Sequence, residues 1–211
     1  MELLVLFLAL AGILWWWRRR NDLSEPIKRS SKPDLSMLPE QFVIYDLETT
    51  GLTCENHEII EIGAIKANRD SDLHVTFQTL VMPIGRVSAT INQITGLDRA
   101  TLKDDGIPIK EALQNFIEFV GDLPMVAYNE QFDRGFLENA CKKNGLPIFE
   151  NGSHCALKMA RRAWPRRASY KLSSLAKYGG LAMDSEHRAL GDCKRTLIVF
   201  VAAAQELRVK L

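Results

Sequence analysis

Short apolar runs separated by polar turns predict four strands in the body of the chain. Residues 42–46 (FVIYD) are almost continuously apolar, which is typical of a strand buried on both faces. Residues 59–67 and 73–81 have the length and the β-branched and aromatic content of two further strands. A short apolar stretch at 125–128 predicts a fourth strand.

Apolar positions spaced by three and four residues predict helices between and after these strands. Leu113, Phe116, Ile117 and Val120 lie on one stripe of a helix predicted over residues 109–120. The same periodicity predicts further helices over residues 132–143, 155–162, 172–178 and 190–207. Three strands in succession, followed by helix, strand and helices, favour an α/β fold in which a mixed sheet is flanked by helices.

The N-terminal part of the chain has a different pattern. Residues 3–17 contain no charge and end in three tryptophans, and three arginines follow at 18–20. The run is somewhat shorter than the ~30 Å hydrocarbon core, but arginine side chains extend toward the interface. We expect residues 1–20 to be a membrane anchor whose C-terminal side lies in the cytoplasm, at the inner membrane of a bacterium. A cleaved leader and an interfacial helix are the alternatives.

Composition separates a linker from one folded domain. Residues 21–39 contain three prolines and four serines without apolar periodicity, which indicates a linker, so that residues 40–211 form the domain. The chain has a net charge of +1, which excludes a strong positive field over the whole molecule. Its four cysteines include no C-x-x-C pair, which argues against the common zinc sites and against a compact disulfide framework.

Two acids at the end of the first predicted strand are candidates for metal binding. Asp46 and Glu48 are two residues apart, so their side chains point to the same side of a strand. Two neighbouring carboxylates repel each other, and a hard divalent cation with oxygen ligands removes the repulsion. The alternative is a solvated strand end that enters the turn at Thr49, Thr50 and Gly51.

Three further candidates are weaker when each is taken alone. Asp133 follows Asn129 by about one turn, and an acid there is also explained by the helix dipole. His187 and Asp192 are five residues apart and cannot share one face of a continuous helix. If they meet at one site, His187 must lie on the preceding loop and Asp192 on the helix. A histidine there is able to accept a proton near neutral pH.

Five segments together are more specific than any single residue. They occur in the order FVIYDLETTGL, IIEIGAI, AYNEQFDRGFL, SYKLSSLAKY and EHRALGDC. This order resembles the DnaQ-like 3′–5′ exonucleases over about residues 40–208, and the H-x4-D spacing resembles their DEDDh branch, which includes RNase T and the proofreading epsilon subunits of bacterial polymerases. The residues that match the branch motifs are Asp46, Glu48, Asp133, His187 and Asp192.

The resemblance implies a fold and a chemistry. The fold is an RNase H-like, five-stranded mixed sheet, and the cofactors are two divalent cations, Mg²⁺ or Mn²⁺, held by Asp46, Glu48, Asp133 and Asp192. His187 is then the base that accepts a proton from the attacking water. The implied activity is hydrolysis of single-stranded DNA from the 3′ end to nucleoside 5′-monophosphates. Alternatives are an RNA-end or oligoribonucleotide exonuclease of the same branch, and an inactive, membrane-tethered module that binds nucleic acid or a polymerase.

The same resemblance suggests residues that contact the substrate. The turn after the first strand would contact the terminal nucleotide, and the ITGL segment at 94–97 would lie near the substrate. The alternatives are a plain turn and a loop that caps a helix. The candidate substrate-binding residues are Thr49, Thr50, Gly51, Leu52, Ile94, Tyr128, Asn129 and Phe132.

A local basic segment contrasts with the neutral domain. Residues 158–171 (KMARRAWPRRASYK) contain six lysines and arginines, no acid, and the aromatic residues Trp164 and Tyr170. Cations hold phosphates and aromatic rings stack on the bases of single strands, so we expect the segment to bind a nucleic acid backbone. The alternative is a solvated basic helix end.

Overall fold

A computed structural model describes residues 35–71, 73–178 and 187–209. The chain divides into two units, Met1–Asp34 and Leu35–Leu211. The predicted anchor at 1–20 and most of the predicted linker at 21–39 lie outside the described residues. Within the described residues, no helix combines the length and the apolar character needed to cross a membrane.

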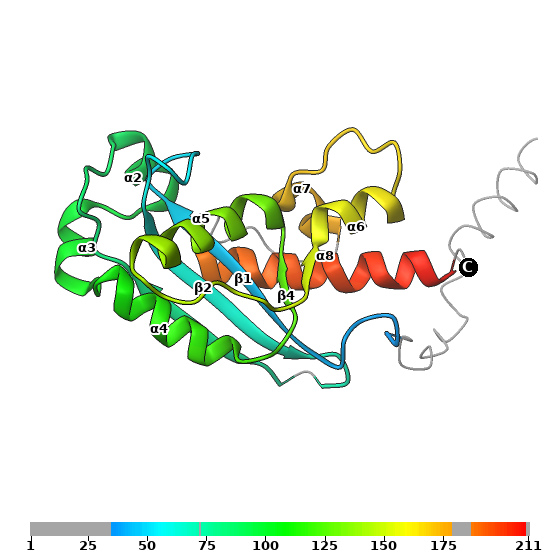
Figure 1. The fold of residues 1–211 in the computed structure, drawn as a ribbon. Coiled ribbons are helices and arrows are strands. Elements are labelled where there is room, and N and C mark those ends of the chain that lie inside the picture. Colours follow the sequence, from blue (N-terminus) through cyan, green and yellow to red (C-terminus); the bar gives the residue numbers. More distant parts are fainter. Residues whose placement is uncertain (1–34, 72, 179–186, 210–211) are drawn as a thin grey trace, which may run out of the picture. The chain divides into compact units, whose positions relative to one another are not determined.

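A five-stranded mixed sheet forms the centre of the domain (Figure 1). Its strands are β1 (Gln41–Thr49), β2 (Ile59–Asn68), β3 (Val75–Leu80), β4 (Met125–Ala127) and β5 (Ser153–Cys155). They are arranged in the order β3-β2-β1-β4-β5. β1–β2 and β2–β3 are antiparallel, whereas β1–β4 and β4–β5 are parallel. The carboxyl ends of β1 and β4 therefore lie at the same edge of the sheet.

Helices cover both faces of this sheet (Figure 1). The described helices are α2 (Ala89–Thr95), α3 (Arg99–Asp105), α4 (Ile109–Val120), α5 (Glu130–Lys143), α6 (Ala156–Ala163), α7 (Leu172–Tyr178) and α8 (Ala189–Val209). One core cluster joins α4 and α5 to the sheet, and a second joins α6 and α8 to its other face. The result is the sheet flanked by helices that the sequence predicts.

Alternation along β1 decides which side chains reach which core. Val43 and Tyr45 are buried in the cluster with α4 and α5, and Phe42 and Ile44 in the cluster with α8. Side chains two residues apart share a face, so Asp46 continues the α8 face where the apolar residues end. The face of β1 that packs its apolar side chains against α8 thus also carries the carboxylate of Asp46.

The four strands and five helices expected from the apolar pattern are present, with boundaries shifted by a few residues. The pattern missed β5, whose three residues SHC carry no apolar repeat. It also missed α2 and α3, which have seven residues each and bury one residue each. Both depend on local caps, because the side chains of Ser88 and Asp98 accept hydrogen bonds from the first-turn amides.

A glycine allows α8 to approach β2 closely. A Cβ atom on Gly63 would lie 2.5 Å from the backbone nitrogen of Leu190 and 2.6 Å from the carbonyl carbon of Ala189. Both of these atoms belong to backbone, which cannot rotate away. Gly63 is paired with Asp46 across the sheet, so the position of α8 over the first acid depends on this contact.

We predict that Gly63→Ala lowers the free energy of unfolding by about 1–3 kcal/mol, because the added methyl group overlaps the backbone of α8. Urea denaturation measures the change. The matched control is Gly152→Ala, since apart from the adjacent residues of the chain no atom lies within 4 Å of the Cβ position of Gly152. That variant should change stability by no more than about 1 kcal/mol. Equal effects of the two substitutions would contradict the role of the close contact.

Candidate active site

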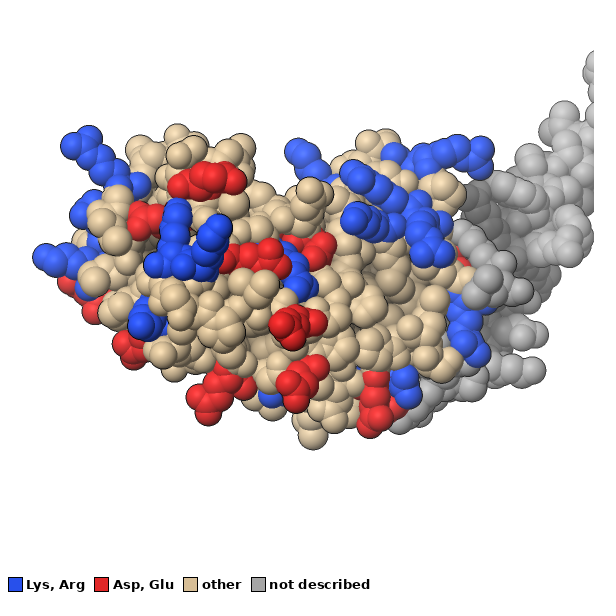
Figure 2. Space-filling model, in the orientation of Figure 1, with Lys and Arg blue, Asp and Glu red and all other residues tan. Residues whose placement is uncertain are grey.

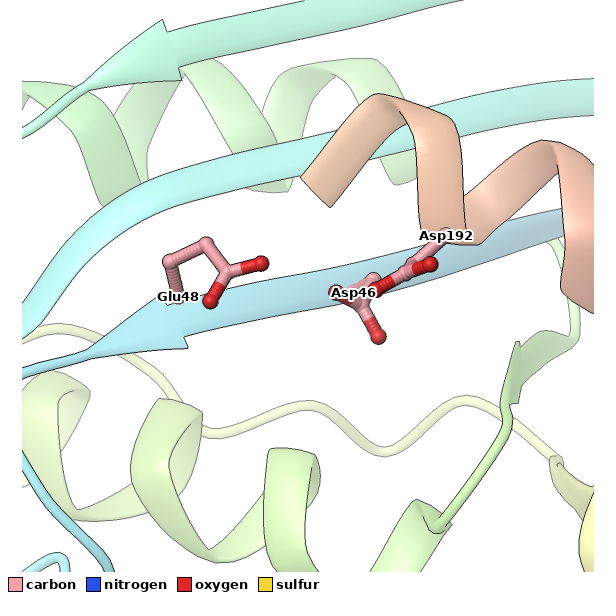
Figure 3. A group of neighbouring side chains, drawn as sticks. All are labelled: Asp46, Glu48 and Asp192. Atoms are coloured by element: carbon pink, nitrogen blue, oxygen red, sulfur yellow. The ribbon is translucent and has the colours of Figure 1, made fainter. Parts of the chain in front are cut away.

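Three carboxylates meet where β1 passes under the start of α8. Asp46 and Glu48 extend from β1, and Asp192 extends from the first turn of α8 (Figure 3). One carboxylate oxygen from each residue lies within 4.8 Å of the others. The i, i+2 spacing on the strand therefore places both acids on one side, as the sequence predicts, and the helix adds the third acid from above.

Asp133 completes the acidic group from another direction. β4 runs parallel to β1, and α5 begins three residues after β4 ends. This connection places Asp133 in the first turn of α5, where the side chain is 4% exposed. Asp133 and the three acids at β1 line one open cleft of about 500 Å³.

His187 lines the same cleft. It is exposed and precedes α8 by two residues, so it is on the loop while Asp192 is on the helix, as the spacing predicts. Its backbone has a φ of +61°, in the left-handed region that residues other than glycine seldom adopt. The structure thus brings all five predicted residues, Asp46, Glu48, Asp133, His187 and Asp192, to one cleft.

Crowding and burial shift the protonation of these acids. Burial, followed by repulsion from Asp133 and Asp192, raises the pKa of Asp46 well above its usual value. Burial and repulsion from Asp192 raise the pKa of Glu48 to about 8. Burial also raises the pKa of Asp133, although hydrogen bonds from backbone amides oppose the shift. Without a bound cation, keeping all of these carboxylates ionised at neutral pH is energetically costly.

The acid cluster has the properties of a divalent-cation site. Its donors are carboxylate oxygens, the ligands that Mg²⁺ and Mn²⁺ prefer. Three of them converge within 4.8 Å. Burial, together with repulsion from neighbouring carboxylates, raises the pKa of Asp46 and of Glu48, and a cation would neutralise the negative charge that these groups repel. Asp46, Glu48 and Asp192 would form the centre of such a site, and Asp133 would face it across the cleft.

Two arginines lie beside the site, and neither is among the predicted site residues, although Arg188 belongs to the EHRALGDC segment. Arg195 is 4% exposed and forms an ion pair with Asp192, one turn away on α8. Arg188, next to His187, forms an ion pair with Glu61 of β2. Glu61 is fully buried. An acid in the middle of the apolar run IIEIGAI is the signal for this pair, because a buried carboxylate requires partners.

Three predicted substrate-binding residues line the cleft, namely Tyr128, Asn129 and Phe132. The hydroxyl of Tyr128 donates a hydrogen bond to the carbonyl oxygen of Tyr170, which joins the cleft wall to the basic segment. Burial raises the pKa of Tyr128 to about 12, so this hydroxyl stays protonated and remains a donor. Lys171, Leu172 and Ser173 also line the cleft; they belong to the SYKLSSLAKY segment but are not among the predicted site residues.

The other predicted substrate-binding residues lie outside the lining of the cleft. Thr49, Thr50, Gly51 and Leu52 form the turn after β1, in which the hydroxyl of Thr49 donates to the carbonyl of Gly51 over 2.6 Å. A Cβ on Gly51 would overlap the ring of His57, so a larger residue there would displace that side chain. Leu52 is 82% exposed and Ile94 is 44% exposed.

Comparison with known proteins identifies the family. Residues 43–200 match the family model described as exonuclease (RNase_T). The chain is 34% identical over 183 residues to DNA polymerase III subunit epsilon of Aquifex aeolicus, covering 86% of this chain and 89% of that protein. This chain belongs to the DnaQ-like exonuclease family.

Other relatives are much longer or more distant. DNA polymerase III PolC-type of Caldanaerobacter subterraneus is 37% identical over 81% of this chain, which spans 12% of that protein. An E. coli ExoI–ssDNA complex has the same fold, with a TM-score of 0.69 and 17% identity over 82% of this chain and 41% of ExoI. Exonuclease X with 5′ overhanging duplex DNA has a TM-score of 0.59 and 27% identity over 77% of this chain and 90% of that chain.

We predict that the stability of the metal-free protein falls as pH rises from about 5 to 9. Carboxyl groups with a raised pKa in the folded state stabilise it below their unfolded pKa, near 4, and this contribution disappears as pH rises through the folded value, about 8 for Glu48. Mg²⁺ should therefore raise the melting temperature more at pH 8 than at pH 5. Thermal unfolding in EDTA and in Mg²⁺ across this range measures both trends.

Asp46→Asn is the informative variant, because it removes the central charge without changing the size of the side chain. It should reduce both the fall in stability in EDTA and the effect of Mg²⁺. A Mg²⁺ effect in the parent protein that is independent of pH would contradict the assignment of these carboxylates.

Proposed function

We propose that this chain is a divalent-metal-dependent 3′–5′ exonuclease that removes nucleoside 5′-monophosphates from single-stranded DNA. The observation that carries the proposal is the meeting of four carboxylates and one exposed histidine at a single open cleft. A catalytically inactive binding module has no need of these groups at one place. Membership of the exonuclease family supports the same chemistry.

Each residue has a part in the proposed hydrolysis. Divalent cations held by Asp46, Glu48, Asp192 and Asp133 would stabilise negative charge on the attacking and leaving oxygens. A water molecule attacks the last phosphodiester, and its proton passes to the unprotonated ring nitrogen of His187. The bond from phosphorus to the O3′ atom of the preceding nucleotide breaks, and this oxygen takes a proton from solvent. The product is a nucleoside 5′-monophosphate.

The choice of DNA follows from the relatives. One of them is named DNA polymerase III PolC-type and another DNA polymerase III subunit epsilon, and two similar solved structures contain DNA. Both the epsilon subunit and ExoI differ from this chain at most positions. Their names therefore support DNA as the class of substrate, and they do not indicate a particular DNA structure or sequence. The same names make a polymerase a candidate partner.

The basic segment at residues 158–171 is the proposed path of the strand. Lysines and arginines gather over α6 and the segment that follows it (Figure 2). Lys171 lines the cleft, and Arg161 stacks over the ring of Tyr170 with 5.8 Å between the guanidinium carbon and the ring centroid. The segment is therefore continuous with the cleft through Tyr170 and Lys171. A phosphate backbone leaving the cleft would meet positive charge there.

We also propose that residues 1–20 anchor the protein in a membrane, with the domain in the cytoplasm of a bacterium. The uncharged run at 3–17 and the arginines at 18–20 support this proposal. The full chain should then sediment with membranes, whereas a chain that starts at Leu35 should stay in the supernatant. A mature protein that starts after Arg20 would contradict the anchor.

Single-turnover cleavage of a 5′-labelled DNA oligonucleotide tests the proposed activity. Asp46→Asn should abolish cleavage, because it removes a carboxylate that would hold the divalent cations, and EDTA should do the same. His187→Ala should lower the rate constant by on the order of 10²- to 10⁴-fold while leaving metal and substrate binding intact. The controls are the exposed residues Asp122 and His74, whose variants Asp122→Asn and His74→Ala should cleave normally.

Two outcomes would contradict this function. Cleavage that persists after complete chelation would exclude metal-dependent hydrolysis. Faster degradation of a labelled RNA strand than of the matched DNA strand would contradict DNA as the substrate and support the RNA-end exonuclease instead.

Substitutions in the basic segment test the proposed strand path. Arg162→Gln combined with Arg166→Gln should weaken binding of long single strands and reduce the salt dependence, because both side chains are exposed. The slope of log K against log salt should fall by about 0.7 for each phosphate that the variant no longer binds. Lys103→Gln with Lys110→Gln, two exposed lysines outside the segment, is the control. An unchanged slope in the arginine variant would show that the segment is only a solvated surface.

A further inference from the structure

The buried carboxylate of Glu61 has no place in the hydrolysis proposed above, yet its contacts lead directly to the active site. Glu61 lies in the middle of β2, is fully buried, and is paired with Glu48 across the sheet. A buried acid beside another acid is costly unless it has strong partners. Its contacts therefore need an explanation.

Arg188 supplies the main contact. Its Nη2 atom is 2.9 Å from Oε1 of Glu61, and its Nε atom is 3.1 Å from Oε2. This is the forked geometry in which both carboxylate oxygens are bound by one guanidinium group. The planar guanidinium fixes direction as well as distance, which a lysine cannot do.

Glu61 also holds the start of α8. Its Oε2 atom accepts a hydrogen bond of 3.1 Å from the backbone N–H of Ala189, the first residue of the helix. A carboxylate at a helix N-terminus satisfies an amide that has no partner within the helix and interacts favourably with the helix dipole. The side chain of Gln78 donates a further hydrogen bond of 2.7 Å to Oε1. One side chain of β2 thus binds two consecutive residues that follow His187.

His187 needs such support because its backbone is strained. Its φ of +61° lies in the left-handed region, which is unfavourable for a residue with a side chain. A conformation of this kind persists only where the surrounding contacts fix it. The two residues that follow His187, Arg188 and Ala189, are both held by Glu61, so these contacts are placed to fix the backbone of His187.

We propose that the Glu61–Arg188 ion pair positions the imidazole of His187 in the cleft, so that Arg188 is a positioning residue for the proton-accepting step. This inference rests on the proposed function of His187. The ion pair acts on the rate of hydrolysis through the geometry of the loop, and contributes little to binding of the DNA strand. The alternative is that the pair serves the stability of the fold alone.

Arg188→Lys is the main variant, because it keeps the positive charge and removes the fork. A second variant, Glu61→Gln with Arg188→Gln, removes both charges together and so leaves no buried charge without a partner. Arg69→Lys is the control, since Arg69 is also a partly buried arginine in an ion pair, with Asp70, outside the cleft. Thermal unfolding of each variant shows whether it is folded at the assay temperature.

The measurement is single-turnover cleavage of a labelled DNA oligonucleotide with Mg²⁺, at enzyme concentrations that also give the half-saturation point. Arg188→Lys should lower the maximal rate constant by on the order of 10- to 100-fold, because a small displacement of a catalytic group has that effect. The half-saturation point of Arg188→Lys should stay within about twofold of that of the parent protein. For Arg69→Lys, both the maximal rate constant and the half-saturation point should stay within about twofold. The neutral pair should behave like Arg188→Lys.

The decisive comparison repeats Arg188→Lys in a His187→Ala background. If Arg188 acts through His187, its substitution should change the remaining rate by no more than about twofold, since the group that it positions is already absent. A full 10- to 100-fold loss in that background would overturn the proposal, because Arg188 would then act independently of His187. Normal rates for both Arg188→Lys and the neutral pair would also overturn it.

The outcome separates this inference from the proposed function. If His187→Ala alone cleaves at the normal rate, the role of His187 is wrong and the inference fails with it. If His187→Ala is slow but Arg188→Lys and the neutral pair both cleave at the normal rate, the function stands and only the positioning role of Arg188 is wrong.

Discussion

Repulsion between carboxylates at the end of β1 is the constraint on which the rest of the site depends. Asp46 and Glu48 share one face of the strand, and Asp192 approaches from α8 to within 4.8 Å. Asp133 adds a fourth acid from α5. The fold holds these groups together although burial and repulsion raise the pKa of Asp46 and Glu48. A divalent cation bound among these carboxylates would remove their mutual repulsion and stabilise their ionised forms.

The positions of these acids follow from packing that is remote from the charges. Alternation along β1 buries Phe42 and Ile44 under α8, and the same alternation continues to Asp46. Gly63 lets α8 approach the sheet, and Glu61 fixes the first residue of α8 by a hydrogen bond. The apolar core and the glycine therefore set the position of Asp192, and the proposed role of the Glu61–Arg188 ion pair is to set the position of His187. Substitutions in any of them should therefore shift the side chains that line the cleft.

Much of this arrangement could be predicted from the sequence, and the reasons for the exceptions are physical. The spacing of Asp46 and Glu48 and the loop position of His187 follow from strand and helix geometry. Only the order of the motifs, compared with the DnaQ-like family, indicates that Asp133 joins them. The strand β5 has too few residues for a periodic pattern, and α2 and α3 depend on caps more than on apolar faces.

The supporting residues were harder to find because their partners are distant in the sequence. The bond between Glu61 and Arg188 links residues 127 positions apart, and no local pattern reports such a pair. The turn from Thr49 to Leu52 illustrates a different difficulty. Its residues lie next to the acids in sequence, but they are absent from the lining of the cleft, and Leu52 is 82% exposed. Proximity along the chain therefore does not decide which side chains line the site.

The central claim is that the acids at β1, α5 and α8 form one divalent-cation site. Anomalous X-ray scattering from a crystal grown with Mn²⁺ and a bound single strand tests it most directly, because the signal locates the metal independently of activity. The account predicts manganese between Asp46, Glu48 and Asp192, with a second ion on the side of Asp46 that faces Asp133. Manganese bound elsewhere, with these four carboxylates free of metal at saturating concentration, would contradict it.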